Sequence, residues 1–147
     1  MLRLDALAEP RGSAYRSLVG LAKDRGCQGL LVVRSGARLG ERGESLLDQL
    51  RPSIRSEAQA QEWPGTRTLD QHLVLTFELN DVTTTLLART VSGLFGWRQP
   101  ELPEDLCFLD SDGEVWLTSV AHESLAWVVA ADEAEAAALR NLGFAGR

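Results

Sequence analysis

The sequence predicts an α+β fold, in which helices pack mainly on one face of a largely antiparallel sheet of about five strands. Residues 72–79 alternate between apolar and polar side chains, as in a strand that buries only one face. Three apolar runs follow at residues 106–109, 115–120 and 125–130, with turn-forming residues between the first two. Strands grouped in this way favour an antiparallel sheet over a doubly wound one.

Two helices and a buried strand are predicted in the first part of the chain. The first helix covers residues 13–26, where apolar side chains recur three and four positions apart and a glycine ends the pattern. Residues 30–33 form a short apolar run, which indicates a buried strand, and a glycine-rich loop follows at residues 34–43. A second helical stripe covers residues 46–58, and Pro52 is expected to bend or split that helix.

Two more helices complete the predicted order αβαβαβββα. The third is capped by Asn80 or Asp81 and carries its apolar stripe over residues 82–95. The fourth covers residues 132–143 and begins with a sequence that resembles a capping box. Residues 110–113, Asp-Ser-Asp-Gly, are typical of a hairpin turn.

The composition indicates one globular domain over residues 1–147. Apolar residues make up 44% of the chain and charged residues 24%, which is ordinary for a domain with its own core. Cys27 and Cys107 are too few for a disulfide framework, and both stand beside apolar residues, as buried free thiols do. The longest apolar run, at residues 125–131, is far shorter than the roughly 18 residues of a membrane span. We therefore expect a cytoplasmic protein with no membrane association.

The net charge of −6 is unevenly distributed. Residues 1–55 carry +4 and residues 56–147 carry −10, so a basic footprint for nucleic acid is absent and we expect no nucleic-acid binding. Such an excess of acidic residues attracts basic partners by long-range steering. The densest acidic block consists of Glu101, Glu104, Asp105, Asp110, Asp112 and Glu114.

Three arginines in the glycine-rich loop form a candidate phosphate site. Arg34, Arg38 and Arg42 lie between a predicted strand and a predicted helix, where backbone amides can hold a phosphate. The loop lacks the Gly-Lys-Ser/Thr of a P-loop, and Glu41 and Glu44 would repel an anion. A solvated loop is therefore the favoured interpretation.

The pair His122 and Glu123 is the candidate catalytic site. It lies between two predicted strands, Asp105 is expected nearby, and a carboxylate beside an imidazole can orient it as a base. The alternative is a structural histidine in a turn, and we favour no catalytic residue over this pair. We expect neither a metal site nor a cofactor, because Asp110-Ser-Asp112-Gly113 lacks the first and last ligands of a calcium loop.

Trp63 and Trp97 are candidate recognition residues, because each stands beside a turn that contains proline. An aromatic side chain on an irregular acidic loop is common in protein-recognition sites. The alternative for both is burial in the core, which the residue type favours. The candidate binding residues are Trp63, Trp97, Glu101, Glu104, Asp105, His122 and Glu123.

Two stretches of the chain resemble a family of small bacterial proteins. They are the run Trp97-Arg-Gln-Pro-Glu-Leu-Pro-Glu-Asp-Leu-Cys-Phe-Leu and the run Asp112-Gly-Glu-Val-Trp-Leu-Thr-Ser-Val-Ala-His-Glu. Glu62-Trp-Pro-Gly-Thr fits the middle of the family. Its members are sometimes labelled stage III sporulation protein AH, and the resemblance implies no activity. A weaker similarity is to Roadblock-type domains, whose final strands and helix it shares, although the strand and helix at residues 72–95 depart from that pattern.

Two hypotheses of function follow. The leading one is a non-catalytic module that binds a basic protein partner, such as an immunity-type or operon-partner protein. Its surface would be the face of the sheet that carries His72, Thr76 and Glu78, which we expect the helices to leave uncovered and which could also hold a second copy of the chain. The alternative is a small enzyme or small-ligand-binding domain that uses His122 and Glu123, which a pocket containing both side chains would favour.

Overall fold

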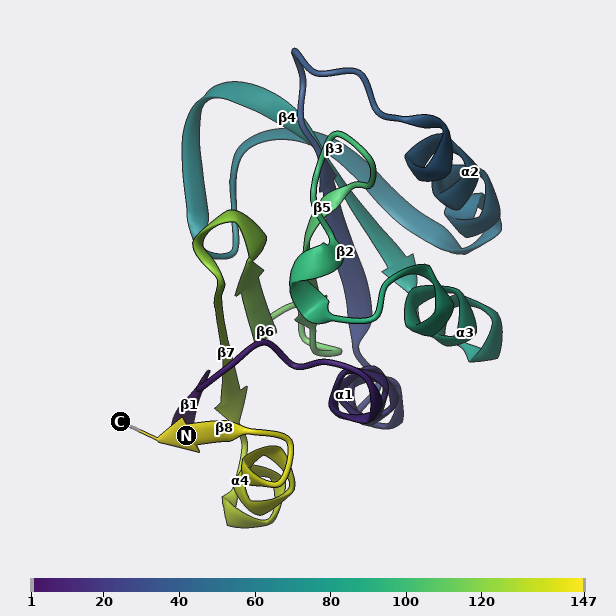
Figure 1. Cartoon of the computed structure of the whole chain (residues 1–147). Coiled ribbons are helices and arrows are strands. Elements are labelled where there is room, and N and C mark those ends of the chain that lie inside the picture. The colour runs from purple at the N-terminus through teal and green to yellow at the C-terminus, as the bar shows by residue number, and fades with distance from the viewer. Residues whose placement is uncertain (1, 147) are drawn as a thin grey trace.

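The computed structural model describes residues 2–146, which form one eight-stranded antiparallel sheet and four α-helices (Figure 1). The helices are α1 (Ser13–Asp24), α2 (Glu41–Leu50), α3 (Asp81–Thr90) and α4 (Glu133–Arg140). The strands are β1 (Leu2–Ala6), β2 (Gln28–Val33), β3 (Ile54–Trp63), β4 (Thr66–Glu78), β5 (Glu104–Leu109), β6 (Val115–Val120), β7 (Leu125–Ala130) and β8 (Phe144–Gly146). Across the sheet they follow the order β3-β4-β2-β5-β6-β7-β1-β8.

The α+β class is correct, but the expectation of about five strands is wrong. Strands β1, β3 and β8 were not foreseen. β1 and β8 are short and lie at one edge of the sheet, whereas β3 forms the other edge and is exposed along most of its length. Residues 54–58 were assigned to a helix, yet Pro52 ends α2 through a short 3-10 turn and the chain then enters β3. An edge strand exposed on both faces has no alternating apolar pattern to reveal it.

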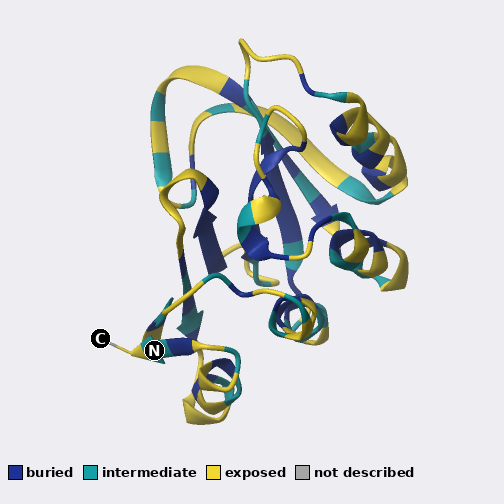
Figure 2. Ribbon diagram, in the orientation of Figure 1, coloured by how far each residue is buried: buried dark blue, intermediate teal, exposed yellow. Residues whose placement is uncertain are grey.

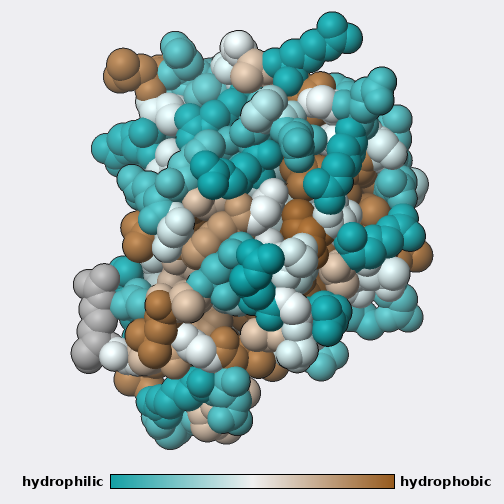
Figure 3. All heavy atoms as spheres, in the orientation of Figure 1, coloured by the Kyte–Doolittle hydropathy of each residue, from teal (hydrophilic) through white to brown (hydrophobic). Residues whose placement is uncertain are grey.

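All four helices pack on the same face of the sheet. Their buried side chains join one core with Leu31 of β2 and Phe77 of β4. The helices contribute Tyr15, Leu18, Val19, Ala22, Leu46, Leu50, Leu86, Leu87, Ala136 and Leu139. Figure 2 shows the resulting pattern, in which the central strands are buried and the outer sides of the helices are exposed. In the view of Figure 3, hydrophilic side chains cover most of the upper part of the molecule and apolar ones gather toward its middle.

The sequence places the start of α3 correctly because its cap is local, although the predicted helical stripe over residues 82–95 runs past the end of α3 at Thr90. The side chain of Asn80 accepts a hydrogen bond from the Thr83 backbone N–H at 2.9 Å, and the Thr83 hydroxyl accepts one from the Asn80 N–H at 2.9 Å. This reciprocal capping satisfies two backbone donors that no turn of the helix can reach. Helix α4 begins in a related way, since Asp132 accepts from the Glu135 N–H at 2.8 Å.

The opposite face of the sheet, here called the open face, carries no helix but is not bare. It holds a second, smaller core of Leu30, Val32, Trp63 and Cys107. Trp63 comes from the tip of the β3–β4 hairpin, which curves away from the helices (Figure 1). The hairpin tip therefore covers apolar side chains of the open face over a small area, as the helices cover those of the other face over a larger one.

The three polar residues expected on the open face have different surroundings. Glu78 is exposed and Thr76 is half-buried, but His72 is only 7% exposed. The ring of Trp63 meets His72 edge-on at 5.6 Å, and the His72 Nδ1 accepts a hydrogen bond from the Ser35 backbone N–H at 2.9 Å. His72 is therefore covered by a hairpin tip and a loop rather than by a helix.

Among residues 2–146, no helix has both the length and the apolar character to cross a membrane.

Gly29 of β2 is required by close packing. It faces Phe77 directly across the β2–β4 pair, and a Cβ atom on Gly29 would lie 2.2 Å from the Phe77 ring. Phe77 is fully buried in the main core and cannot move aside without disturbing its neighbours. The small residue lets the ring lie flat against the sheet.

We expect Gly29→Ala to lower the free energy of unfolding by about 1–3 kcal/mol, the usual cost of overpacking a core. Gly20 in α1 is the matched control, because its added Cβ would meet nothing within 4 Å. Gly20→Ala should instead stabilise the protein by about 0.5–1 kcal/mol, because alanine loses less entropy in a helix. Urea unfolding of both variants measures the difference, and equal effects would contradict the packing assigned to Phe77.

Candidate functional site

A bulge in β5 brings two acidic side chains to the open face. Val32 of β2 pairs with Glu104 and Leu30 pairs with Cys107, so one residue of β2 opposes two of β5. Asp105 takes up the extra residue with a φ of 59°, in the left-handed region that few residues other than glycine adopt. In a regular strand Glu104 and Asp105 would point to opposite faces. The bulge instead allows both carboxylates to contact side chains of the open face.

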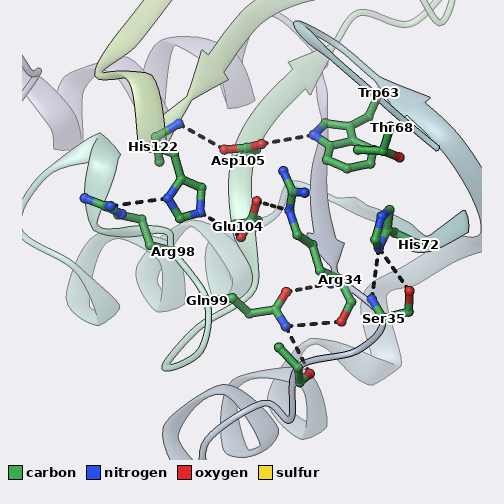
Figure 4. Close-up of polar contacts among 12 residues, drawn as sticks. Arg34, Ser35, Trp63, Thr68, His72, Arg98, Gln99, Glu104, Asp105 and His122 are labelled. Atoms are coloured by element: carbon green, nitrogen blue, oxygen red, sulfur yellow. Dashed lines mark hydrogen bonds and ion pairs between the residues drawn. The ribbon is translucent and has the colours of Figure 1, made fainter. Parts of the chain in front are cut away.

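The carboxylate of Glu104 joins an arginine to a histidine (Figure 4). Glu104 is fully buried. Its Oε2 accepts a hydrogen bond from Nε of Arg34 at 2.5 Å, and its Oε1 lies 3.2 Å from Nε2 of His122. A buried carboxylate is stable only when it is paired and hydrogen-bonded, and these two contacts satisfy that requirement.

His122 uses both ring nitrogens in this network. Nη2 of Arg98 lies 3.3 Å from Nδ1 of His122, and arginine can only donate. Nδ1 is therefore the acceptor, and Nε2 carries the proton that is donated to Glu104. The residue that orients His122 is thus Glu104 and not Asp105, which the sequence had suggested. Both ring nitrogens of His122 therefore have a protein partner, and a substrate that used Nδ1 would have to displace Arg98.

Asp105 fastens the hairpin tip to the turn that follows β6. Its Oδ2 accepts a hydrogen bond from Nε1 of Trp63 at 3.0 Å, and its Oδ1 accepts one from the Ala121 backbone N–H at 2.9 Å. Burial raises the pKa of the Asp105 carboxyl above its ordinary value, and the bonds from Trp63 and Ala121 offset part of that rise. One carboxylate thereby connects β3, β5 and the short 3-10 turn Ala121–Glu123.

A pocket of about 240 Å³ lies between the hairpin tip and that 3-10 turn. Residues 65–67 form one wall, His122 and Glu123 form another, and Arg34 and Asp105 also line it. The pocket contains the pair that the sequence had singled out as a candidate site. A larger depression of about 640 Å³ beside α2 is lined mainly by exposed charged side chains such as Arg38 and Glu44, and no buried polar side chain faces it.

The other candidate binding residues do not form one surface. Trp97 is fully buried, and its Nε1 donates a hydrogen bond to the hydroxyl of Tyr15 at 3.0 Å. Trp63, Glu104 and Asp105 are also buried, so a partner cannot reach them. The exposed members are Glu101, His122 and Glu123.

The acidic block seen in the sequence is divided in space. Glu104 and Asp105 stand at the start of β5, whereas Asp110, Asp112 and Glu114 follow its end. Six strand residues span about 20 Å, so the two parts lie at opposite ends of β5. Glu104 and Asp105 are buried, so the charge available to steer a partner comes from Glu101 and from the second part.

The three loop arginines also have separate surroundings. Arg34 binds Glu104 on the open face, whereas Arg42 donates to the Thr90 carbonyl oxygen and lies 3.8 Å from Glu101. Arg38 is exposed beside acidic residues of α2. The three arginines therefore do not form one cluster, and the alternative of a shared phosphate site gains no support from their positions.

Neither thiol is placed for nucleophilic chemistry. Cys27 and Cys107 are both buried and free. Burial raises the pKa of the Cys27 thiol to about 11 and that of the Cys107 thiol to about 12, so the reactive thiolate is scarce at neutral pH. Within residues 2–146, no group of three or more histidine, cysteine or acidic side chains is arranged to hold a metal ion.

No protein-family model, curated protein or solved structure matches this chain. The resemblance noted in the sequence therefore stays a prediction. Sequence reasoning also missed Gln99, whose side-chain amide bonds both the N–H and the carbonyl oxygen of Arg34. The only sequence signal for this contact was that Arg34 directly follows a buried strand, where a backbone N–H and carbonyl group need new hydrogen-bond partners.

Glu104→Gln should lower the free energy of unfolding by about 2–3 kcal/mol, in the range of a buried hydrogen-bonded charge. The amide would keep one acceptor for Arg34 but present a donor to the proton on His122. Glu101→Gln is the control, because that side chain is 78% exposed and should change stability by less than about 0.5 kcal/mol. Urea denaturation measures the free energy of unfolding of both variants. An equally small change for Glu104→Gln would contradict a stabilising role for the contacts of Glu104 with Arg34 and His122.

Proposed function

We propose that the protein is a non-catalytic module that binds a basic protein partner on the open face of its sheet. The observation that carries the proposal is a set of partly exposed apolar side chains on this face, beyond the hairpin tip. Val115 is 37% exposed and Leu125 is 48% exposed. The half-buried members of the set are Val74, Leu109, Trp127 and Val129.

Strand pairing places these side chains on one face but not all side by side, because Val115 begins β6 whereas Leu125 pairs with Val120 at its end. Leu109 belongs to the small core of the open face and pairs with Val115, and residues directly opposite each other share a face. Trp127 pairs with Thr118, and both lie against Gly65 of the hairpin tip. The helix face buries most of its large apolar side chains, although Leu2, which pairs with Ala130, is 41% exposed there. Partly exposed apolar side chains gathered on one face commonly mark an interaction surface.

An acidic turn borders this apolar surface. Asp112 and Glu114 are exposed on the β5–β6 turn, directly before Val115. Oδ1 of Asp110 accepts hydrogen bonds from the backbone N–H groups of Asp112 and Glu114, at 2.9 and 3.0 Å. The turn is therefore held in shape with two carboxylates facing solvent. An apolar centre with a charged rim is the usual anatomy of a protein interface, and the acidic rim favours a basic partner.

The site chemistry supports binding more than catalysis. His122 and Glu123 line the pocket, but both nitrogens of His122 are engaged and neither thiol is exposed. We place the protein in the cytoplasm, as expected for free cysteines, and in the class of immunity-type or operon-partner proteins.

Val115→Arg tests this surface without touching a buried group. We expect the wild-type protein to retain a basic protein from a lysate of its native cell, with retention falling as salt rises. Val115→Arg should lose that protein, because the substitution places a positive charge where the apolar surface meets the acidic turn and opposes a basic partner. Val82→Arg is the matched control, since Val82 is 69% exposed on α3 and on the other side of the sheet.

Identical recovery by all three proteins would contradict the proposal. The other informative result is self-association. Light scattering of the purified protein should give a monomer, and a dimer that Val115→Arg dissociates would show that a second copy of the chain occupies this face instead of a basic partner.

A further inference from the structure

We propose that the pocket beside His122 binds a small zwitterion of the α-amino acid class. Arg34 would receive its carboxylate, and the exposed carboxylate of Glu123 would accept from its ammonium group. This site is separate from the protein-binding surface proposed above, although it lies at one end of the same face of the sheet.

Arg34 is held in place before any ligand arrives. The amide of Gln99 bonds its backbone at both the N–H and the carbonyl oxygen, at 2.5 and 3.2 Å. Its Nε donates to Glu104, and its guanidinium carbon lies 5.1 Å from the centre of the Trp63 ring. An arginine that is held at its backbone, at its Nε and at the face of its guanidinium loses little conformational entropy when it binds a carboxylate.

The two amino groups at the end of Arg34 are available to a ligand. Within residues 2–146, neither Nη atom of Arg34 has a hydrogen-bond partner, although the side chain is only 31% exposed. Arg34 lines the pocket, and Figure 4 shows its guanidinium pointing toward Asp105 and Trp63. Paired N–H donors at this spacing match the two oxygens of a carboxylate.

The charges around the pocket exclude a simple anion as the best ligand. Glu104 already balances Arg34, and Glu62 pairs with Arg67 at 3.1 Å. Asp105 and Glu123 then leave the pocket with an excess of negative charge. A phosphate dianion would be repelled by that charge, whereas a ligand that carries a carboxylate and an ammonium group meets a donor in Arg34 and an acceptor in Glu123.

The size and rigidity of the pocket point to a small ligand. Its volume of about 240 Å³ lies below the roughly 300–1,000 Å³ typical of drug-sized sites. The wall at the hairpin tip is fixed, because Gly65 adopts a φ of 81° and packs so closely on Val120 that an added Cβ would lie 2.7 Å from its Cγ2. Arg67, whose side chain is 84% exposed, also lines the pocket.

The indole N–H of Trp63 is a direct reporter, because it donates to Asp105 in the pocket wall. The purified protein, labelled with ¹⁵N, is titrated with each common L-amino acid and with acetate, ethylamine and inorganic phosphate. At least one amino acid should shift this resonance in a saturable way. Each of the other three probes should bind about tenfold more weakly or not at all, because each lacks one charge or carries an excess.

Variants of exposed residues keep the test independent of folding. Arg67→Gln and Glu123→Gln should weaken binding about twofold to fivefold, as expected for exposed charge pairs. Arg34→Lys keeps the charge but removes the paired donors, and it should weaken binding by about tenfold or more. Arg55→Gln is the control, because Arg55 lies on β3 of the hairpin that also carries Arg67, but it pairs with Glu78 at 3.4 Å and does not line the pocket.

The absence of a saturable shift with every amino acid would overturn the proposal. Equal affinity for acetate or phosphate would also overturn it, because the site would then select only a negative charge. Equal amino acid affinity of the Glu123→Gln and Arg55→Gln variants would contradict the role of Glu123 as the acceptor for the ammonium group.

Discussion

The double hydrogen bond to Asp105 is the interaction on which the open face depends. One oxygen binds the indole N–H of Trp63 and the other binds the Ala121 backbone N–H. The hairpin tip and the 3-10 turn after β6 are far apart in the sequence, and this carboxylate fixes both to β5. It can do so because the left-handed backbone at Asp105 turns the carboxylate toward the open face beside that of Glu104.

Fixing the hairpin tip divides the open face into two parts. Under the tip, Leu30, Val32 and Cys107 are sealed by Trp63 into the second core. Beyond it, the apolar side chains around Val115 and Leu125 stay partly exposed. The pocket lies at the boundary, where the tip meets His122 and Glu123. A protein partner and a small ligand would therefore occupy neighbouring areas, separated by the hairpin tip.

The elements predicted correctly from the sequence are those whose signals are local. Alternation located the core of β4, and Asn80 and Asp132 marked the starts of α3 and α4. Strand β3 was missed because nearly all of its side chains face solvent, so its composition carries no period. Strands β1 and β8 were missed because each is short and pairs with a segment far away in the sequence, β1 with β7 and β8 with β1.

The candidate site was predicted only in part, for a related reason. His122 and Glu123 do line a pocket, but the bulge at Asp105 leaves no mark in a run such as Glu-Asp-Leu-Cys-Phe-Leu. Because the bulge could not be predicted, nothing in the sequence indicated that Glu104 is the partner of Arg34 and His122. The burial of Trp63 likewise depends on Asp105, which lies 42 positions further along the chain. Contacts at such separations are set by the tertiary fold.

Hydrogen exchange of the Trp63 indole N–H tests most directly whether the hairpin tip is fixed to Asp105. The indole N–H of Trp97 is the internal reference, because it is fully buried and donates to Tyr15. We predict that the Trp63 indole N–H exchanges slowly in native protein, within about tenfold of that of Trp97, since opening the tip must break its bond to a buried carboxylate. Rapid exchange at Trp63 while Trp97 stays protected would show that the tip opens freely, and would contradict both the closed second core and the pocket it forms.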